Sequence, residues 1–372
     1  MALEKVSRIT TTVNKGAHPG LIDALKKAGI NNLHVAAGRA SVLQERTGPF
    51  SAFSSGRGMA DDPVDIISFL VDRQREGDFL SLIAEEANLH IPGMGSVYSE
   101  DMELLDAHQM CSTNKPQPSY REKPQNLHSE LTGITCIVQR GAGDAISRVV
   151  LESGACVPTI TYGLGTGVRD KLGLLRITIP ADKEVLTLVM SSYDVEAVLE
   201  LMIEAGQLDQ PGRGFIYVFS VNQGIINTRI TSGSTGAAAS MEQIISALDG
   251  LKGGMEWRRR GADRATGKDR FFLRGLSDLT LICNEGRGSD LVQAAMDVGA
   301  SGATISKTAF AAANPAEGGV SPAREVCNMI VARDQLDDIV KAVEKAGVND
   351  DKTHGMVMTA PVPRAFTYIA KS

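Results

Sequence analysis

The stretch DVEAVLELMIEAGQLDQPGRGFIYVFSV, residues 194–221, predicts a helix, a glycine turn and a strand in succession. Four apolar residues recur at the spacing of one helix face: Val195, Val198, Leu199 and Met202. We expect Asp194 to cap the start of this helix and Gly206 to end it in the left-handed conformation. The opposite side carries three glutamates at a four-residue spacing: Glu196, Glu200 and Glu204. Their mutual repulsion weakens an isolated helix, so the apolar face must pack against another element.

The strand that follows the turn, FIYVFSV at 215–221, is apolar on both faces. Side chains alternate along a strand, which puts Phe215, Tyr217, Phe219 and Val221 on one face and Ile216 and Val218 on the other. One set of side chains can pack against the helix. The other set would face water unless a second sheet covers it, and each large apolar side chain left exposed forfeits about 1.5–3 kcal/mol.

The order strand, helix, strand, strand, helix, strand is written three times along the chain. Glycines end the first helix of each copy at Gly29, Gly154 and Gly299, and open its last strand at Gly95, Gly214 and Gly355. We therefore predict an α+β fold of three ferredoxin-like βαββαβ units, at 1–105, 131–229 and 276–372. If their sheets cover one another, the units form an intramolecular pseudotrimer. Three separate units joined by linkers would leave apolar sheet exposed.

Two segments between the units are predicted to be linkers. Residues 106–130 are polar, contain three prolines and have no apolar period. Residues 230–275 contain a short predicted helix, SMEQIISALDGL, and a basic stretch, EWRRRGADRATGKDRFFLR. The basic stretch is either a solvated connector or a contact for phosphate or a partner.

The stretch VEAVLELMIEAGQLDQPGRGFIYVFSV, with the βαββαβ order and the loop between the second and third strands, resembles the PII-type (nitrogen regulatory protein P-II) signal-transduction family. The resemblance is clearest over Thr132–Arg229 and extends to Lys5–Leu105 and Ser277–Ile369. It implies a PII trimer fused into one polypeptide. It also implies adenine-nucleotide binding in the clefts between units, and loops that dock on a regulated transporter or enzyme.

The PGRG turn supplies the first group of candidate binding residues. Gly212 and Gly214 let backbone N–H groups approach a phosphate, and Arg213 adds a cation. Arg229 follows the strand, near the place where the family puts basic residues on the phosphates. The loop of the first unit contains Gly38 and Arg39, in the manner of the G-R-Q start of the family's loop.

A glycine-rich run in the second unit supplies the other candidates: Gly163, Gly165 and Gly167, followed by Arg169 and Lys171. The run leads into a strand rather than a helix, so it is not a dinucleotide-binding fingerprint. It is either a flexible turn or an anion cradle, and the two cations beside it add weight to the cradle.

Several positions depart from the family. The family usually carries a lysine directly after the second glycine of the turn, where this chain has Phe215, Ser96 and Met356 in its three units. The family's Arg-x-Arg after the last strand is absent, and Ala40 stands where the loop glutamine is expected. The resemblance implies ATP, ADP or AMP as the ligand, and these departures favour a nucleotide with fewer phosphates or another small anion.

Composition narrows the functional class. The net charge of −6 argues against a general nucleic-acid binder, and no apolar run is long enough to span a membrane. Cys136, Cys283 and Cys327 lie in apolar runs and are predicted to be buried free thiols. The six histidines are scattered without metal-binding spacing, so no catalytic or metal site is expected.

We therefore expect a cytoplasmic regulatory protein, not an enzyme, with no required cofactor. Its expected partner is a regulated membrane transporter (ammonium or inorganic carbon), which would recruit it to the membrane, or a metabolic enzyme. It should be a monomer of 39.5 kDa. The alternative is a structural or adaptor subunit that has kept the pseudotrimer and lost its ligand sites.

Overall fold

The computed structural model describes residues 4–16, 19–44, 58–107, 127–167, 181–228, 231–232, 248, 251, 270–312 and 322–369. In these residues, helices alternate with strands that pair almost entirely antiparallel, which gives a mixed α/β fold. Most of the predicted docking loops, the helix at 240–251 apart from Leu248 and Leu251, and the basic stretch up to residue 269 lie outside the described residues. None of the helices in these ranges is long and apolar enough to cross a membrane.

The chain divides into a first, a second and a third segment with the same order of elements. The first contains β1 (Glu4–Asn14), α1 (Pro19–Lys27), β2 (Asn32–Gln44), β3 (Gly58–Asp72), the 3-10 turn η2 (Arg73–Arg75), α2 (Glu76–Glu86) and β4 (Gly95–Ala107). The second contains β5 (Leu131–Gln139), α3 (Gly143–Ser153), β6 (Thr159–Gly167), β7 (Asp182–Ser191), α4 (Val195–Gly206), β8 (Gly214–Ser220), β9 (Gly224–Ile225) and β10 (Thr231–Ser232). The third contains β11 (Leu276–Asn284), α7 (Gly288–Asp297), β12 (Gly302–Ala312), β13 (Ala323–Ala332), η3 (Arg333–Gln335), α8 (Leu336–Lys345), β14 (Met356–Val362) and β15 (Arg364–Thr367).

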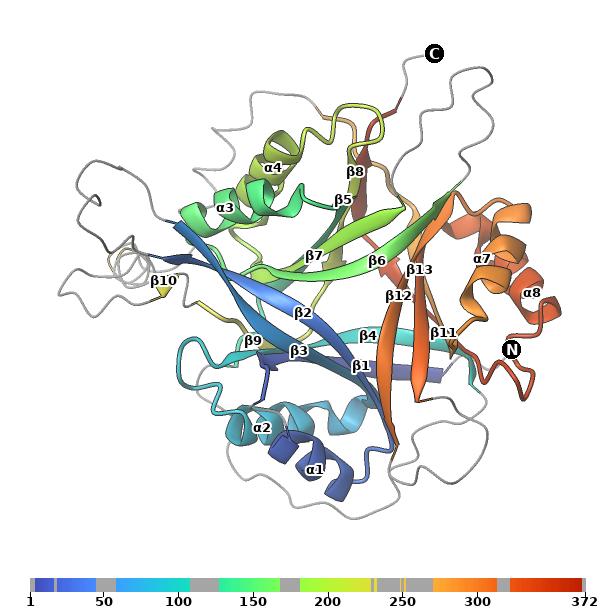
Figure 1. The fold of residues 1–372 in the computed structure, drawn as a ribbon, viewed down its shortest axis with the longest axis horizontal. Helices are drawn as coiled ribbons and strands as arrows, with labels where there is room; N and C mark the ends of the chain where they lie inside the picture. The colour runs from blue at the N-terminus through green and yellow to red at the C-terminus, as the bar shows by residue number, and fades with distance from the viewer. Residues whose placement is uncertain are drawn as a thin grey trace.

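Strand pairing follows one pattern in each segment. The strand orders are β2-β3-β1-β4, β6-β7-β5-β8 and β12-β13-β11-β14. The helix pairs α1/α2, α3/α4 and α7/α8 lie on the outside at separate corners, with the strands toward the centre (Figure 1). Each pair buries its apolar side against one face of its own strands and forms a separate core.

The second strands of the segments join the three sheets near the centre. β12 pairs with β6 at Gly302↔Gly167 and with β2 at Phe310↔His34. β2 also pairs with β6 at Arg39↔Ile160. These contacts close a ring of β2, β6 and β12, whose crossing is visible in Figure 1.

The ends of the segments are exchanged in the same cyclic sense. β15, at the end of the third segment, pairs with β8 of the second. β9, at the end of the second, pairs with β4 of the first, and the end of β4 pairs with β14 of the third. Each segment therefore extends the sheet of another.

The two faces of β8 are both covered, as the alternation predicted. Ile216 and Val218 are buried in the core formed with α3 and α4. Tyr217, Phe219 and Val221 pack instead with residues of the other segments, among them Tyr98 and Val362. The apolar second face is an interface between segments.

The end of α4 differs from the sequence-based prediction. Gly206 is the last helical residue, and the left-handed conformation is taken by Gln207, with φ 51°. The prediction for Gly206 is therefore wrong. A Cβ on Gly206 would lie 2.9 Å from Cδ1 of Ile146, so glycine here allows α3 and α4 to approach closely. The other helix-ending glycines have positive φ as predicted: Gly29, Gly154 and Gly299.

The centre, where the inner faces of the sheets meet, combines polar side chains with the apolar ones of the interface. It holds a cavity of about 220 Å³ lined by threonine, serine and asparagine side chains together with valine, isoleucine and aromatic ones, from all the segments. Arg8 pairs with Glu100 at 3.0 Å beside this cavity, and Asp278 faces it from the third segment. Polar lining allows water to fill the space that sheet twist leaves open.

Candidate ligand cleft

The cleft between the second and third segments brings together most of the predicted glycines. Its volume is about 400 Å³. The end of β6 contributes Gly165 and Gly167, and the turn before β8 contributes Gly212 and Gly214. The start of β12, residues 301–304, forms the opposite wall.

Glycine is required in these walls because backbones meet there. A Cβ on Gly214 would lie 2.6 Å from the carbonyl oxygen of Ile137, and one on Gly302 would lie 2.4 Å from that of Thr166. Such contacts exclude any side chain at either position. The glycines thus let neighbouring backbones approach closely at the walls of the cleft, while the space between the walls stays open.

The lining combines an apolar floor with a few polar groups. The apolar residues are Ile137, Val138, Phe215, Tyr217, Ala303 and Ile330. The polar ones include Thr166, Lys183, Thr304, Asn328 and Thr367. A cleft of this size, apolar with a few directed polar groups, is typical of a small-molecule site.

Lys183 is the basic side chain among the described lining residues. It lies on β7 directly opposite Gly163 and is half-buried. Its aliphatic stem runs along Gly165, where an added Cβ would lie 2.7 Å from Cε of the lysine. One flexible cation suits a ligand with one or two negative charges better than a triphosphate.

The C-terminal strand closes one side of the cleft. β15 pairs with β8, and Oγ1 of Thr367 donates to the carbonyl of Gly214 at 2.9 Å. Tyr368 lines the cleft and is 40% exposed. Nε2 of Gln139 donates to the carbonyl of Gly212 at 3.1 Å and holds the turn from the other side. The turn that faces the ligand space is therefore fixed by side chains on both flanks.

The junction between the first and second segments is much smaller, at about 90 Å³. By strand register, Val42, Val64 and Val157 stand where the larger cleft has Gly167, Lys183 and Gly302. These valines belong to a buried apolar cluster that joins the two segments. Apolar packing has replaced the open space and the cation.

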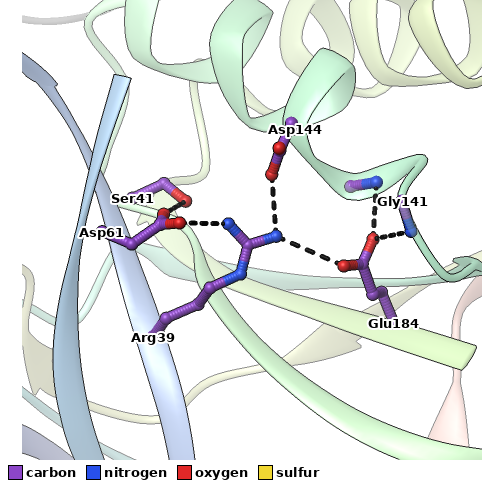
Figure 2. Close-up of polar contacts among 7 residues, drawn as sticks. Arg39, Ser41, Asp61, Gly141, Asp144 and Glu184 are labelled. Atoms are coloured by element: carbon purple, nitrogen blue, oxygen red, sulfur yellow. Dashed lines mark hydrogen bonds and ion pairs between the residues drawn. The ribbon is translucent and has the colours of Figure 1, made fainter.

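Arg39 lies at this same junction and contacts three carboxylates (Figure 2). Its guanidinium donates to Asp61 at 2.6 Å, to Asp144 at 2.7 Å and to Glu184 at 3.3 Å. Burial alone would lower the pKa of Arg39, but the bonds to Asp144 and Asp61 outweigh it and raise that pKa. An arginine already matched by three carboxylates ties segments together and has little charge left for an anion.

Glu184 connects this cluster to the start of α3. Its Oε2 accepts from the backbone N–H groups of Gly141 at 3.0 Å and Gly143 at 2.8 Å (Figure 2). Glu325 does the same for Gly288 at the start of α7, at 2.7 Å. A carboxylate at a helix N-terminus is stabilised by the helix dipole.

Gly38 and Gly163 lie at strand crossings rather than in loops. A Cβ on Gly38 would lie 2.8 Å from the carbonyl oxygen of Ile160 on β6. One on Gly163 would lie 2.7 Å from Cγ2 of Thr304 on β12. β2 and β6 extend through these residues, so the expectation of a flexible turn at 163–167 is wrong. Their smallness serves the close approach of two segments.

The predicted site residues therefore separate into three groups. Gly165, Gly167, Gly212 and Gly214 line the second–third cleft, and exposed Arg213 lies in the turn between the last two. Gly38, Arg39 and Gly163 are at other contacts between segments. Arg169, Lys171 and Arg229 lie outside the described residues.

Sequence reasoning missed Lys183 and the 301–304 wall. Lys183 opens a strand and has no motif around it. It lies in the charged triplet Asp182-Lys183-Glu184 that precedes an apolar run, and such a triplet does not indicate a ligand site. The 301–304 wall comes from another segment, and only the pairing of β12 with β6 places it there.

Within the described residues, no group of three or more His, Cys, Asp or Glu side chains is arranged to hold a metal ion. Cys136, Cys156, Cys283 and Cys327 are buried free thiols, and burial raises the pKa of Cys156 to about 12. The thiol of Cys156 therefore stays protonated and unreactive at neutral pH.

Comparisons with known proteins give little beyond this geometry. No family model matches the chain, and no curated protein matches it. Among solved structures, the chain is similar to Arabidopsis thaliana PII bound to citrate, with 22% sequence identity and a TM-score of 0.20. That match covers 26% of this chain and 78% of the PII chain.

Proposed function

We propose that the chain is a PII-like regulatory protein whose three segments are ferredoxin-like units closed into an intramolecular pseudotrimer. The repeated strand order, the ring of β2, β6 and β12 and the cyclic exchange of segment ends support this arrangement. Each end binds the next unit in the same direction, as a closed heterologous ring requires.

The function that this scaffold supports best is the sensing of a small anionic ligand in the second–third cleft. The observation that carries the proposal is the 400 Å³ cleft that joins a glycine turn, a glycine strand end and Lys183 above an apolar floor. The aromatic Phe215 and Tyr217 suit a heterocycle, and the single lysine suits one or two charges. An adenine nucleotide with few phosphates, ADP or AMP, meets both requirements.

Ligand binding would act through the loop that follows β6. β6 ends at Gly167, in the wall of the cleft, and the predicted docking loop starts there. A ligand held by this wall would change the populations of loop conformations and so the affinity for a transporter or an enzyme. This output is taken from the resemblance of the sequence to the PII family.

Isothermal titration calorimetry with ATP, ADP, AMP, cyclic AMP, 2-oxoglutarate and bicarbonate tests the sensing proposal. We expect one site per chain and a preference for an adenine nucleotide with few phosphates. Lys183→Ala and Arg213→Ala should each weaken binding about tenfold or more, as expected for loss of a charged contact. Lys341→Ala, an exposed lysine on α8, is the matched control and should bind as the wild type does.

Absence of heat with all six compounds would remove the sensing proposal. An adaptor that has lost its sites would then be the better description. The narrowness of the first–second junction, with valines in place of the glycine and lysine, favours that alternative at one interface. A constitutive complex with a partner, unchanged by any nucleotide, would select it.

A further inference from the structure

A buried arginine lies at the junction between the third and first segments, and it has no counter-ion among the residues that the structure describes. Arg324, on β13, is 5% exposed. Its Nη1 donates to Oδ1 of Asn284 at 3.2 Å, and its Nη2 donates to the carbonyls of His354 and, at 3.5 Å, Ile282. Its Nε has no hydrogen-bond partner. Within the described ranges, no carboxylate lies at ion-pair distance from this guanidinium, and burial lowers the pKa of Arg324.

A charge held in this way is costly for the folded protein. Removing a cation from water costs free energy that only a close anion or a full set of acceptors restores. Arg324 has neutral acceptors for part of its guanidinium and none for Nε. A site that binds an anion during function explains why such a residue is retained.

An aromatic ring lies against Arg324 and separates it from a second buried polar group. The ring of Phe310 is 5.7 Å from Cζ of Arg324 on one side and 5.4 Å from the ring of His34 on the other. His34 is 6% exposed, and its Nδ1 has no partner. Burial and the charge of Arg324 lower the pKa of His34 to about 3, so the imidazole is neutral at pH 7. Two nitrogens without a partner among the described residues thus lie on either side of one partly buried ring.

Strand register shows that this junction corresponds to the open cleft. Phe310 stands at the position of Gly165, Arg324 at that of Lys183, and His34 at that of Thr304. The basic side chain is therefore kept, whereas the glycine is replaced by a phenylalanine that fills the space. What remains is a cavity of about 30 Å³ lined by Asn32, His34 and Met356, room for about one water molecule.

We propose that this junction is a second ligand site, for a compact planar anion, and that the Phe310 ring occupies it when no ligand is bound. The ligand's ring takes the place of the Phe310 ring between His34 and Arg324. Its anionic group then lies beside the guanidinium and supplies the missing counter-charge. The proposal concerns a different junction from the second–third cleft and stands whether or not that cleft binds a nucleotide.

Benzoate and benzyl alcohol, titrated by calorimetry into the full chain, test the proposal. The two compounds have the same ring and differ in charge. Phe310→Ala should bind benzoate at least tenfold more tightly than the wild type does, because the ring no longer has to be displaced. The same variant should prefer benzoate to benzyl alcohol at least tenfold. Adding Arg324→Met, which keeps the length of the side chain, should abolish that preference.

Two controls locate the effect and guard against loss of the fold. Lys341→Ala in the Phe310→Ala background should leave benzoate binding unchanged, since Lys341 is exposed on α8 and does not line this junction. Phe310→Leu, a smaller truncation, replaces Phe310→Ala if circular dichroism shows that the alanine variant is unfolded. Equal affinity for benzoate and benzyl alcohol would show an apolar cavity only. That result, or no gain over the wild type, would overturn the proposal.

Discussion

Arg39 shows how a residue chosen for ligand chemistry can serve assembly instead. The sequence offered Gly38-Arg39 as the start of a loop that meets phosphate. In the structure, Asp144 and Glu184, more than a hundred residues away, contact the guanidinium. An arginine is well suited to this because its planar fork donates in several directions at once.

Replacing Arg39 should therefore affect stability and leave ligand binding unchanged. We expect Arg39→Met to lower the free energy of unfolding by about 1–2 kcal/mol, because Glu184 is buried while Asp61 and Asp144 are half-exposed. Urea denaturation measures this. Arg73→Met, which removes an exposed pair with Asp101, is the control and should cost less than about 0.5 kcal/mol. Loss of nucleotide binding in Arg39→Met would return that residue to the ligand site.

Asp278 makes the stability of the protein depend on pH. Burial raises the pKa of Asp278 above its ordinary value of 3.8, and the charge of Arg8 only partly opposes this. The folded state then holds the proton to higher pH than the unfolded state does. From about pH 4 up to the raised pKa, this carboxyl therefore makes stability fall as pH rises, by about 1.4 kcal/mol per unit of pKa difference.

Asp278→Asn should remove this contribution. The difference in unfolding free energy between variant and wild type, measured in urea from pH 4 to pH 8, should move in favour of the variant as pH rises. Taking the difference cancels the titration of the carboxylates that do not interact with Asp278, whereas Glu100, whose pKa Asp278 helps to raise, contributes to the difference. A constant difference across this range would mean that Asp278 has an ordinary pKa in the folded protein.

At the scale of elements, the acidic side of α4 forms ion pairs with arginines that the helix pattern does not predict. Arg270 contacts Glu200 at 2.7 Å, and Arg364 contacts Glu196. Both arginines also stack on aromatic rings of the same region, Phe366 and Phe272. These glutamates would repel one another in an isolated helix. In the folded protein their ion pairs hold β15 and the chain before β11 against α4.

Gln207, at the end of α4, adopts a left-handed backbone conformation that glycine would adopt at lower cost. A non-glycine residue in the left-handed conformation costs about 1–2 kcal/mol relative to the right-handed one, and glycine avoids most of that cost. Gln207→Gly should thus raise the unfolding free energy by about 1 kcal/mol. Gly154→Ala, at φ 79°, should lower it by a similar amount. Thermal unfolding of both variants tests the pair, and a destabilised Gln207→Gly would contradict it.

The same elements show what could be predicted from sequence and what could not. Local patterns placed α4 and both faces of β8 correctly, because they depend on residues a few positions apart. The roles of Gly38 and Gly163 were misjudged because a glycine needed for a strand crossing looks like one in a loop. Lys183 and the 301–304 wall depend on pairing between segments, which no local spacing contains. Arg324 gave no signal because its significance depends on which side chains surround it, and among the described residues none of these is a carboxylate.

At the scale of the whole molecule, the interior distinguishes one segment from another. By register, Arg8, Gly133 and Asp278 occupy equivalent positions on the inner face. A trimer of identical units would place three like charges together at this level, which is strongly unfavourable in a buried setting. Here the three positions hold a basic residue, a glycine and an acidic residue. The ring of Phe219 occupies the space that a side chain at Gly133 would fill. The charge pattern therefore favours closure within one chain.

If the interfaces between segments hold the molecule together, a chain cut between two segments should stay assembled. A protease site inserted between residues 107 and 127 separates the first segment from the other two. Strand pairings with the other two segments resist its release: β4 pairs with β14 and β9, and β2 pairs with β6, β12 and β10. Apolar clusters that mix residues of different segments, such as Val6 and Met102 with Ile282 and Met358, add burial to these pairings.

After cleavage, both fragments should co-elute in size-exclusion chromatography at the position of the intact 39.5 kDa chain. They should separate only in denaturant, and elution as two smaller species in buffer would show that the linkers, rather than the interfaces, hold the molecule together.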